Sequence, residues 1–416
     1  MKKYRWLGIA SLILTMLLFA PAVQAKTVAY GKCGAERSFV TWVLNEEGTL
    51  LISGSGAMKD FEDEAPWSSH DTEIKKVVIE EGVTNISSHA FNSCGLLIEA
   101  EIPGSVIMIG EGAFSNCRLM KTVSLSSGLE VLGKSAFSSC YAMTEIAIPD
   151  TVTTIGDEAF AFCRRLAGIS IPANVTEIGK RVFRNCRSLK EITVAGNNPV
   201  YDSRNNCSAI IYSASDTLVA GCKGTVIPQS VTAIDDWAFF ASSIEEITLP
   251  DSIERIGENA FCMCSKLTGI HIPRNVEYIG AGAFGCCEIL RDITVDERNT
   301  VYDSRNNCRA IIHTGRDKLI VGCADTMIPY TVVSIGESAF NGCGLKKILI
   351  PAGIKKIGSY AFDNNWELTD IYYRGSEEQW KKIFIEEEGV GSSVLKDVTI
   401  HYNYSGRGEG YTGTAP

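Results

Sequence analysis

A short sequence unit recurs along this chain and constrains its fold more than any other feature. An Ala-Phe pair marks the unit, and its phenylalanine recurs at equal spacing as Phe91, Phe114, Phe137 and Phe160. A fixed period of roughly 20–29 residues indicates a leucine-rich-repeat solenoid, in which each unit stacks on the next. The same pair recurs at Phe239, Phe261, Phe284, Phe340 and Phe362. Because one unit cannot bury its own apolar face, the units must share a continuous core.

The residues within the unit predict its local structure. The unit reads I-x-I-P-x-x-V-x-x-I-G-x-x-A-F-x-x-C-x-x-L-x-x. Alternating residues such as Ile146 and Ile148 predict a short strand with one buried face, which Pro149 ends because proline cannot donate to a ladder. Gly156 and its equivalents suit a turn with an unusual backbone angle. We therefore expect a β-rich leucine-rich-repeat solenoid of stacked short parallel strands with irregular or short helical backs.

Two units are longer than the others. Their insertions lie near 195–227 and 296–328, and both contain the sequence Tyr-Asp-Ser-Arg-Asn-Asn-Cys. Alternating apolar residues on either side of Ser213–Asp216 and of Thr314–Asp317 predict a hairpin in each. The spacing between the two copies indicates that a block of four units was duplicated.

Composition changes at both ends of the repeats. Residues 1–25 begin with cations, continue with an apolar run and end in small residues, which predicts a signal peptide. We expect a β-rich N-terminal cap over 26–75, the solenoid over 76–373 and a small C-terminal cap over 374–404. The Gly-rich residues 405–416 predict a flexible tail. No second apolar stretch has membrane length, so we expect a mature chain without a membrane span that is secreted or associated with the cell surface.

The charge and the motifs exclude several classes of function. The net charge is −10, and removal of Lys2, Lys3 and Arg5 with the signal peptide would make it −13. So acidic a chain repels nucleic acids and anionic membranes. No G-x-S-x-G, Walker or dinucleotide motif is present, and the five histidines have no paired spacing. We therefore expect no enzyme activity and no cofactor.

Most of the fifteen cysteines follow the repeat, three positions after its phenylalanine. These are Cys94, Cys117, Cys140, Cys163, Cys186, Cys264, Cys287 and Cys343. We interpret this cysteine column as small buried side chains at a turn. A metal site is not expected, because its ligands must converge on one point whereas a column spreads them along the solenoid. The Cys262-x-Cys264 and Cys286-Cys287 sequences have no histidine pair nearby.

The cysteines of the insertions form a separate group. If each hairpin turns at its centre, two pairs of cysteines face each other directly, within the ~5.5 Å between Cα atoms that a disulfide spans. The pairs are Cys207 with Cys222 and Cys308 with Cys323. Two buried thiols in contact remain the alternative. Residues 202–206 weakly resemble a calcium loop, but Arg204 stands where an oxygen ligand belongs.

The outward residues of the predicted strands are the candidate binding surface. Small hydroxyl side chains lie there beside a row of carboxylates, forming an acidic surface that can hydrogen-bond. The candidate residues are Glu99, Glu101, Ser124, Glu145, Ser170, Glu191, Thr193, Glu246, Thr248 and His271. An ordinary solvated sheet face remains the alternative.

Three motifs together resemble the BspA-like leucine-rich-repeat proteins of bacterial surfaces. They are the unit ending A-F-x-x-C, the insert D-S-R-N-N-C and the Tyr-Tyr-x-Gly-Ser-Glu-Glu-Gln-Trp sequence at 372–380. The resemblance implies export, a non-enzymatic role and attachment to host or bacterial surface molecules. We therefore expect a monomeric adhesion protein that binds proteins or glycans through its repeats. The alternatives are an accessory region of an extracellular carbohydrate-active or cell-wall enzyme, and a structural spacer.

Overall fold

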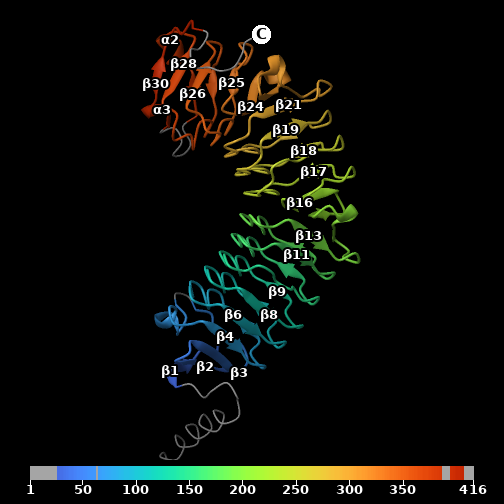
Figure 1. The fold of residues 1–416 in the computed structure, drawn as a ribbon, viewed down its shortest axis with the longest axis vertical. Coiled ribbons are helices and arrows are strands. Elements are labelled where there is room, and N and C mark those ends of the chain that lie inside the picture. The colour runs from blue at the N-terminus through green and yellow to red at the C-terminus, as the bar shows by residue number, and fades with distance from the viewer. Residues whose placement is uncertain (1–25, 62–63, 387–393, 407–416) are drawn as a thin grey trace, which may run out of the picture. The chain divides into compact units, whose positions relative to one another are not determined.

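The computed structural model describes residues 26–61, 64–386 and 394–406. The chain divides into a first unit that ends at Phe160 and a second that begins at Ala161, coloured blue to cyan and green to red in Figure 1. The predicted signal peptide lies outside the described residues. In the part of the chain that the structure does describe, no helix combines the length and the apolarity needed to cross a membrane.

In the first unit, one six-stranded sheet joins the N-terminal residues to the repeats. Its strands are β1 (Thr27–Lys32), β2 (Phe39–Asn45), β3 (Thr49–Ser55), β4 (Lys76–Ile79), β6 (Glu99–Ile102) and β8 (Thr122–Leu125). The first three strands are antiparallel neighbours, and β4, β6 and β8 then follow in parallel. In β6 the burial alternates along the strand, so Ala100 and Ile102 face the core while Glu101 faces solvent.

Each repeat of the first unit also contributes a second, shorter strand that the sequence analysis did not predict. These strands are β5 (Asn85–Ile86), β7 (Met108–Ile109), β9 (Val131–Leu132) and β10 (Thr154–Ile155), and they pair in parallel. Strands β7 and β10 end at the isoleucine that precedes the motif glycine, and β9 ends at a leucine in the same position. Two residues are too few to show the alternation by which strands are recognised.

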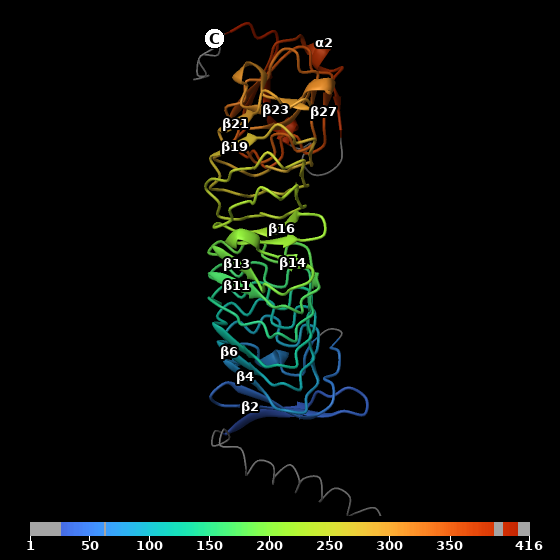
Figure 2. The ribbon, with the colours of Figure 1, turned by 90° about the vertical axis from the view of Figure 1, so that its right-hand side faces the viewer.

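The second unit repeats both series of strands. The longer strands are β11 (Gly168–Ile171), β13 (Glu191–Val194), β19 (Gly269–Ile272), β21 (Asp292–Val295), β26 (Lys347–Ile350), β28 (Asp370–Tyr373) and β30 (Thr399–His401). The shorter ones are β12 (Glu177–Ile178), β17 (Ala233–Ile234), β18 (Arg255–Ile256), β20 (Tyr278–Ile279), β25 (Ser334–Ile335), β27 (Lys356–Ile357) and β29 (Phe384–Ile385). In the view of Figure 2, β11 and β13 lie one above the other in successive turns. The predicted solenoid of stacked parallel strands is confirmed.

The two insertions form the predicted hairpins. The first comprises β14 (Tyr201–Asp202), η2 (Arg204–Asn206), β15 (Ala209–Tyr212) and β16 (Thr217–Gly221). The second comprises β22 (Tyr302–Asp303), η3 (Arg305–Asn307), β23 (Ala310–His313), η4 (Thr314–Arg316) and β24 (Lys318–Gly322). In each, the last strand pairs in parallel with a shorter strand of the next repeat, β17 or β25. The insertions are therefore part of the solenoid and not appendages to it.

The motif phenylalanines form a column of stacked rings in the core. In the first unit the centroids of Phe91 and Phe114 lie 5.0 Å apart, and those of Phe114 and Phe137 5.4 Å apart. Trp67 of the N-terminal region, just before η1 (Ser68–His70), continues the column, with its ring 5.4 Å from Phe91 and its Nε1 donating to the Ala90 carbonyl. These aromatic side chains are fully buried, so each contributes both apolar burial and ring contacts to the core.

The motif glycines have a different role from the predicted one. Gly156, Gly257 and Gly280 have no left-handed backbone angle; instead, a Cβ on Gly156 would lie 2.6 Å from the backbone nitrogen of Lys134 in the preceding turn. The left-handed angles fall at two other positions, the residue before the Ala-Phe pair, such as Ser135, and the second residue after the phenylalanine, such as Asn116. The prediction of an unusual angle at these glycines is wrong, and close approach of two backbones explains them.

A capped helical turn lies near the end of the chain. In α2 (Glu377–Trp380), Ser376 and Gln379 form a capping box, each side chain accepting a hydrogen bond from the other's backbone nitrogen. Trp380 is buried, with its ring 5.1 Å from that of Tyr373. After α3 (Val394–Asp397), β30 pairs with β28. These contacts cover the apolar face of the last repeat.

Candidate functional site

The cysteine column has a structural role. Its eight thiols are buried, as predicted. The Sγ of Cys117 donates to the Phe91 carbonyl at 3.1 Å and that of Cys264 to the Phe239 carbonyl at 3.1 Å, so the thiol connects one repeat to the preceding one. In the last repeat Asn365 replaces the cysteine, and its Nδ2 donates to the Phe340 carbonyl at 2.7 Å. Burial raises the pKa of Cys287 to about 12, which keeps this thiol protonated and unreactive at neutral pH.

The cysteines of the insertions do not face each other directly. In the first hairpin the register shifts between Ile210 and Ile211, which places Gly221 opposite Ala209. Continuing this register sets Ser208, not Cys207, level with Cys222, whose Sγ lies 3.2 Å from the Ser208 carbonyl. The second hairpin has the same shift. The predicted direct pairing is therefore wrong, because a β-bulge adds one residue to one strand.

All four insert cysteines are thiols in the structure. A disulfide in each hairpin stays a prediction, but direct pairing of the two cysteines across the strands no longer supports it. Peptide mapping of the folded protein under non-reducing conditions tests it: linked peptides are expected for Cys207 with Cys222 and for Cys308 with Cys323. Free thiols at all four positions in an oxidising medium would contradict it.

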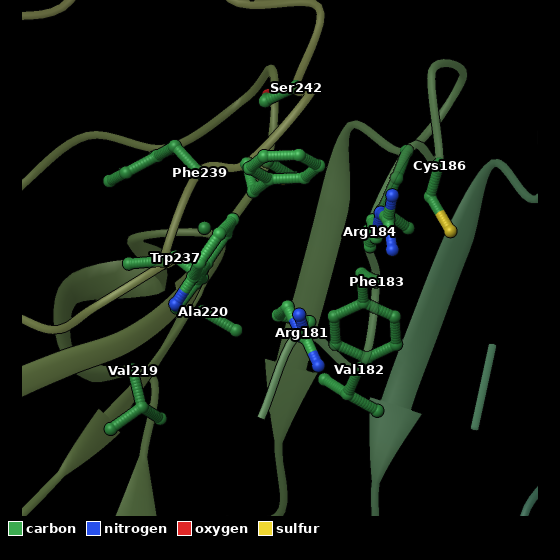
Figure 3. A pocket seen from close by; sticks show the side chains of 15 residues that line it. Arg181, Val182, Phe183, Arg184, Cys186, Val219, Ala220, Trp237, Phe239 and Ser242 are labelled. Carbon is green, nitrogen blue, oxygen red and sulfur yellow. The ribbon is translucent and has the colours of Figure 1, made fainter. Parts of the chain in front are cut away.

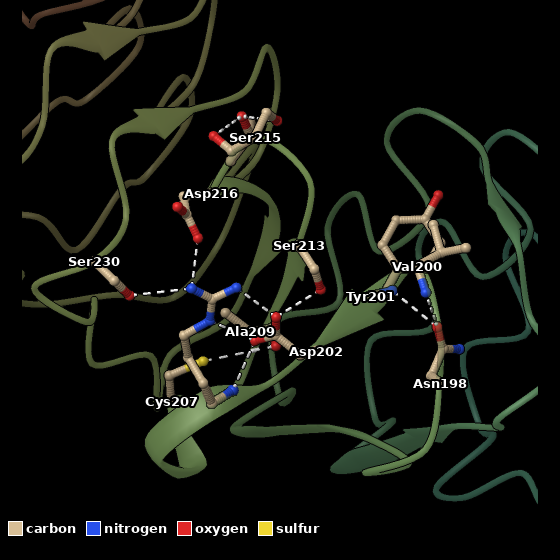
Figure 4. Close-up of polar contacts among 12 residues, drawn as sticks. Asn198, Val200, Tyr201, Asp202, Cys207, Ala209, Ser213, Ser215, Asp216 and Ser230 are labelled. Carbon is tan, nitrogen blue, oxygen red and sulfur yellow. Dashed lines mark hydrogen bonds and ion pairs between the residues drawn. The ribbon is translucent and has the colours of Figure 1, made fainter.

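An arginine organises the polar residues of each insertion. Nε and Nη2 of Arg204 donate to the two carboxylate oxygens of Asp202, the first at 2.8 Å. Nη1 donates to Asp216, on the far side of the hairpin, and to Ser230, in the following turn (Figure 4). Ser213 also donates to Asp202, at 2.7 Å. The carboxylate that weakly resembled a calcium ligand is thus held by a guanidinium. Arg305 makes the same contacts with Asp303, Asp317 and Thr331 in the second copy.

This network predicts acid sensitivity. Burial opposes ionisation of Asp202, but the hydrogen bonds from Arg204 and Ser213 outweigh it and lower the pKa of the carboxyl to about 2. An unfolded aspartate titrates near ~3.9. Because the folded pKa is the lower one, the stabilisation is complete above about pH 4 and is lost as the pH falls towards 2. Asp202→Asn should therefore flatten the decline of unfolding free energy over this range, measured by urea denaturation, whereas Glu47→Gln on an exposed turn should not.

The structure places the predicted binding residues on the outward side of the strand segments. Nine of the ten are exposed and Glu99 is half-buried. Strands β11 and β13 set Gly168 beside Glu191 and Ser170 beside Thr193. Glu145, Glu246 and Thr248 lie in the equivalent segments of their repeats, which form no strand.

An ion pair offsets part of the charge of this surface. In the first unit, Nζ of Lys76 lies 3.0 Å from Oε1 of Glu99 and 2.5 Å from Oε1 of Glu101, so one cation offsets both carboxylates. In the second unit, neither Glu191 nor Glu246 forms an ion pair with any residue that the structure describes. Glu145 of the first unit likewise forms no ion pair with a described residue, so carboxylates without a cation partner lie in both units.

A small void marks the first insertion. Arg181, Val182 and Phe183 line one side of it, and Val219 and Trp237 line the other (Figure 3). Its volume is about 20 Å³, room for about one water molecule. It cannot hold a larger ligand. A larger cavity in the same unit is lined by Cys262 and Cys286. The sequence analysis did not pair these two cysteines, because they hold different positions in the repeat.

Comparison with known proteins identifies the repeat. The profile described as "BspA type Leucine rich repeat region" matches six copies, over residues 84–206, 218–309 and 322–400, more than half of the chain. The structure is similar to a leucine-rich repeat protein from Eubacterium ventriosum (TM-score 0.61, 22% identity, 82% of this chain and 90% of that one). It is also similar to a leucine rich cell surface protein from Faecalibacterium prausnitzii (TM-score 0.51, 25% identity, 84% and 97%). No curated protein sequence matches.

Proposed function

This chain belongs to the family of BspA-type leucine-rich repeat proteins, and from this premise we propose that it is a secreted or cell-surface protein that binds a protein or glycan through the outward face of its longer strands. The observation that carries the proposal is the stacking of exposed polar side chains at one-repeat spacing, as for Ser170 beside Thr193. The similarity to a leucine rich cell surface protein supports a surface role. We propose no catalytic activity.

The chemistry of the second unit favours a particular kind of partner. Ser170, Thr193 and Thr248 present hydroxyl groups, and the neighbouring Glu191 and Glu246 present carboxylates. Since no described cation pairs with these two carboxylates, they remain available to a ligand. A basic protein surface complements them, and a glycan can hydrogen-bond to both the carboxylates and the hydroxyls. Because solenoid units present equivalent positions side by side, one partner can contact several repeats at once.

The partner itself has to be found by a binding screen. Residues 26–416 would be tested against arrays of extracellular-matrix proteins and of glycans, at low and at physiological salt. The proposal expects binding to a basic protein or to a glycan, with affinity for a basic protein falling as salt rises. Absence of binding to every member of both arrays would count against it.

A pair of charge reversals locates the binding face once a partner is known. Glu191→Lys with Glu246→Lys should weaken binding to a basic partner about tenfold and flatten its salt dependence, because the attraction that steers association is reversed. The matched control is Glu254→Lys with Glu277→Lys, two exposed carboxylates that precede the shorter strands β18 and β20. Equal affinity of the two double variants would show that the strand face is only solvated surface and would direct attention to the insert hairpins.

A further inference from the structure

A cavity of about 290 Å³ lies in the second unit, among the turns that follow the motif phenylalanines. Its wall includes Arg181, Arg184 and Trp237, from the repeats on either side of the first insertion. Cys262 and Cys286 line it from the next two repeats. The cavity is large enough to admit a small molecule, and it brings two cationic side chains and two sulfurs into one place.

Cys262 and Cys286 differ from the other thirteen cysteines, all of which are buried whereas these two are partly exposed. They stand outside the cysteine column: Cys262 directly follows Phe261, and Cys286 is the second residue after Phe284. The fold brings them together, because the Met263 nitrogen donates to the Gly285 carbonyl at 2.8 Å and so holds the two turns side by side.

The two thiols are neighbours on the wall of the cavity. The Cys262 sulfur lies 3.7 Å from the position that a Cβ on Gly285, the residue before Cys286, would occupy. Adjacent strands of a sheet are ~4.8 Å apart. Residue 286 lies one position beyond the residue level with Cys262. A spacing of ~4.8 Å between turns and of ~3.3 Å along the chain would put the two Cα atoms about 6 Å apart, within the ~4.4–6.8 Å that a disulfide spans.

The surroundings make the two sulfurs unequal. The neighbouring Cys262 thiol lowers the pKa of Cys286 and outweighs the effect of its partial burial. The Cys286 thiol donates to Oδ1 of Asn341 at 3.1 Å, and Nδ2 of Asn364 lies 3.9 Å from the same sulfur. The neighbouring Cys286 and burial together raise the pKa of Cys262. Cys286 is therefore the more acidic thiol of the pair and the better placed to act as the thiolate nucleophile.

We propose that Cys262 and Cys286 are a modification site, at which a small anionic disulfide entering the cavity converts the two thiols into a reversible disulfide between consecutive repeats. The Cys286 thiolate attacks one sulfur of the small disulfide, and the other sulfur leaves as a thiolate and takes up a proton. The Cys262 sulfur then attacks Cys286 in the mixed disulfide, losing its proton and releasing the second small thiol. Two cysteine thiols are oxidised and one small disulfide is reduced to two thiols. Arg181 and Arg184 on the wall suit a carboxylate-bearing reagent such as oxidised glutathione.

Peptide mapping of the unaltered protein tests the proposal directly. The folded chain, residues 26–416, would be incubated with oxidised glutathione, alkylated and digested without reduction. The expected product links the peptides of Cys262 and Cys286, and excess reduced glutathione added before the alkylation should reverse it. Separate glutathione adducts on both cysteines, or two unmodified thiols, would overturn the proposal. So would a link from either cysteine to Cys264 or Cys287.

Single variants separate the roles of the two sulfurs. Cys262→Ser should leave a stable glutathione adduct on Cys286, because no second thiol resolves it. Cys286→Ser should leave Cys262 much less modified, since the more acidic nucleophile is gone. Circular dichroism would establish that both variants fold. Equal adduct yields in the two variants would contradict the assigned order of attack, and native alkylation of Cys262 and Cys286 no faster than that of buried Cys264 would contradict the site itself.

Discussion

Replacing Phe261 with alanine is expected to lower the free energy of unfolding by about 3–5 kcal/mol, the usual loss for a large buried aromatic side chain. The Phe261 ring is fully buried between two others, with centroids 4.9 Å from Phe239 and 5.2 Å from Phe284. The variant loses apolar burial and two ring stacks at once, and it leaves a cavity that the rigid column cannot close. Urea denaturation followed by circular dichroism measures the change.

The same prediction specifies which repeats the Phe261→Ala substitution destabilises. In a solenoid each repeat contacts only its neighbours, so hydrogen exchange should accelerate mainly in the repeats of Phe239 and Phe284. Phe39→Ala is the matched control, because that ring is 78% exposed and its loss should cost less than about 0.5 kcal/mol. If Phe261→Ala were as stable as the control, the stacked column could not be a main source of core stability.

The fold could be predicted well from the sequence because the same unit occurs many times, and each copy indicates the same local structure. The alternation in segments such as 99–102, the buried Ala-Phe pair and the buried cysteine three positions later recur so often that one interpretation satisfies all of them. The structure confirms each of these features. The shorter strands were missed because a two-residue strand has no period. The angle assigned to Gly156 was wrong because an unusual torsion and a close backbone contact both select glycine.

The candidate sites were less predictable because they depend on register and on contacts between repeats. One bulge in the first hairpin places Ser208 instead of Cys207 opposite Cys222. The alternation of apolar residues in the sequence does not indicate this bulge. Cys262 and Cys286 are separated by one position more than the length of the repeat. They therefore hold different positions in the unit, and comparing equivalent positions does not pair them. Only the packing of one turn on the next brings their sulfurs together.

The Gly-Cys ending of each insertion leads to the last prediction, that Gly221→Ala destabilises the protein by about 1–3 kcal/mol through overpacking. A motif phenylalanine donates its backbone hydrogen bond to the alanine of the next repeat, as Phe261 does to Ala283, and Gly221 donates in the same way to Ala238. Gly221 thus occupies a phenylalanine position without a ring. The neighbouring Phe239 fills the space, and a Cβ on Gly221 would lie 2.1 Å from its Cε1.

The duplicated insertion and an open glycine provide the comparison for this test. Gly322 stands in the same relation to Phe340, also with 2.1 Å between the added Cβ and Cε1, so Gly322→Ala should cost a similar amount. A Cβ on Gly196 would meet no atom within 4 Å, so Gly196→Ala should be neutral or slightly stabilising through its effect on the unfolded chain. None of the three glycines has a left-handed angle, so backbone strain cannot account for a difference. Similar urea midpoints for Gly221→Ala and Gly196→Ala would mean that the Phe239 ring moves aside freely, and the glycine would then need another explanation.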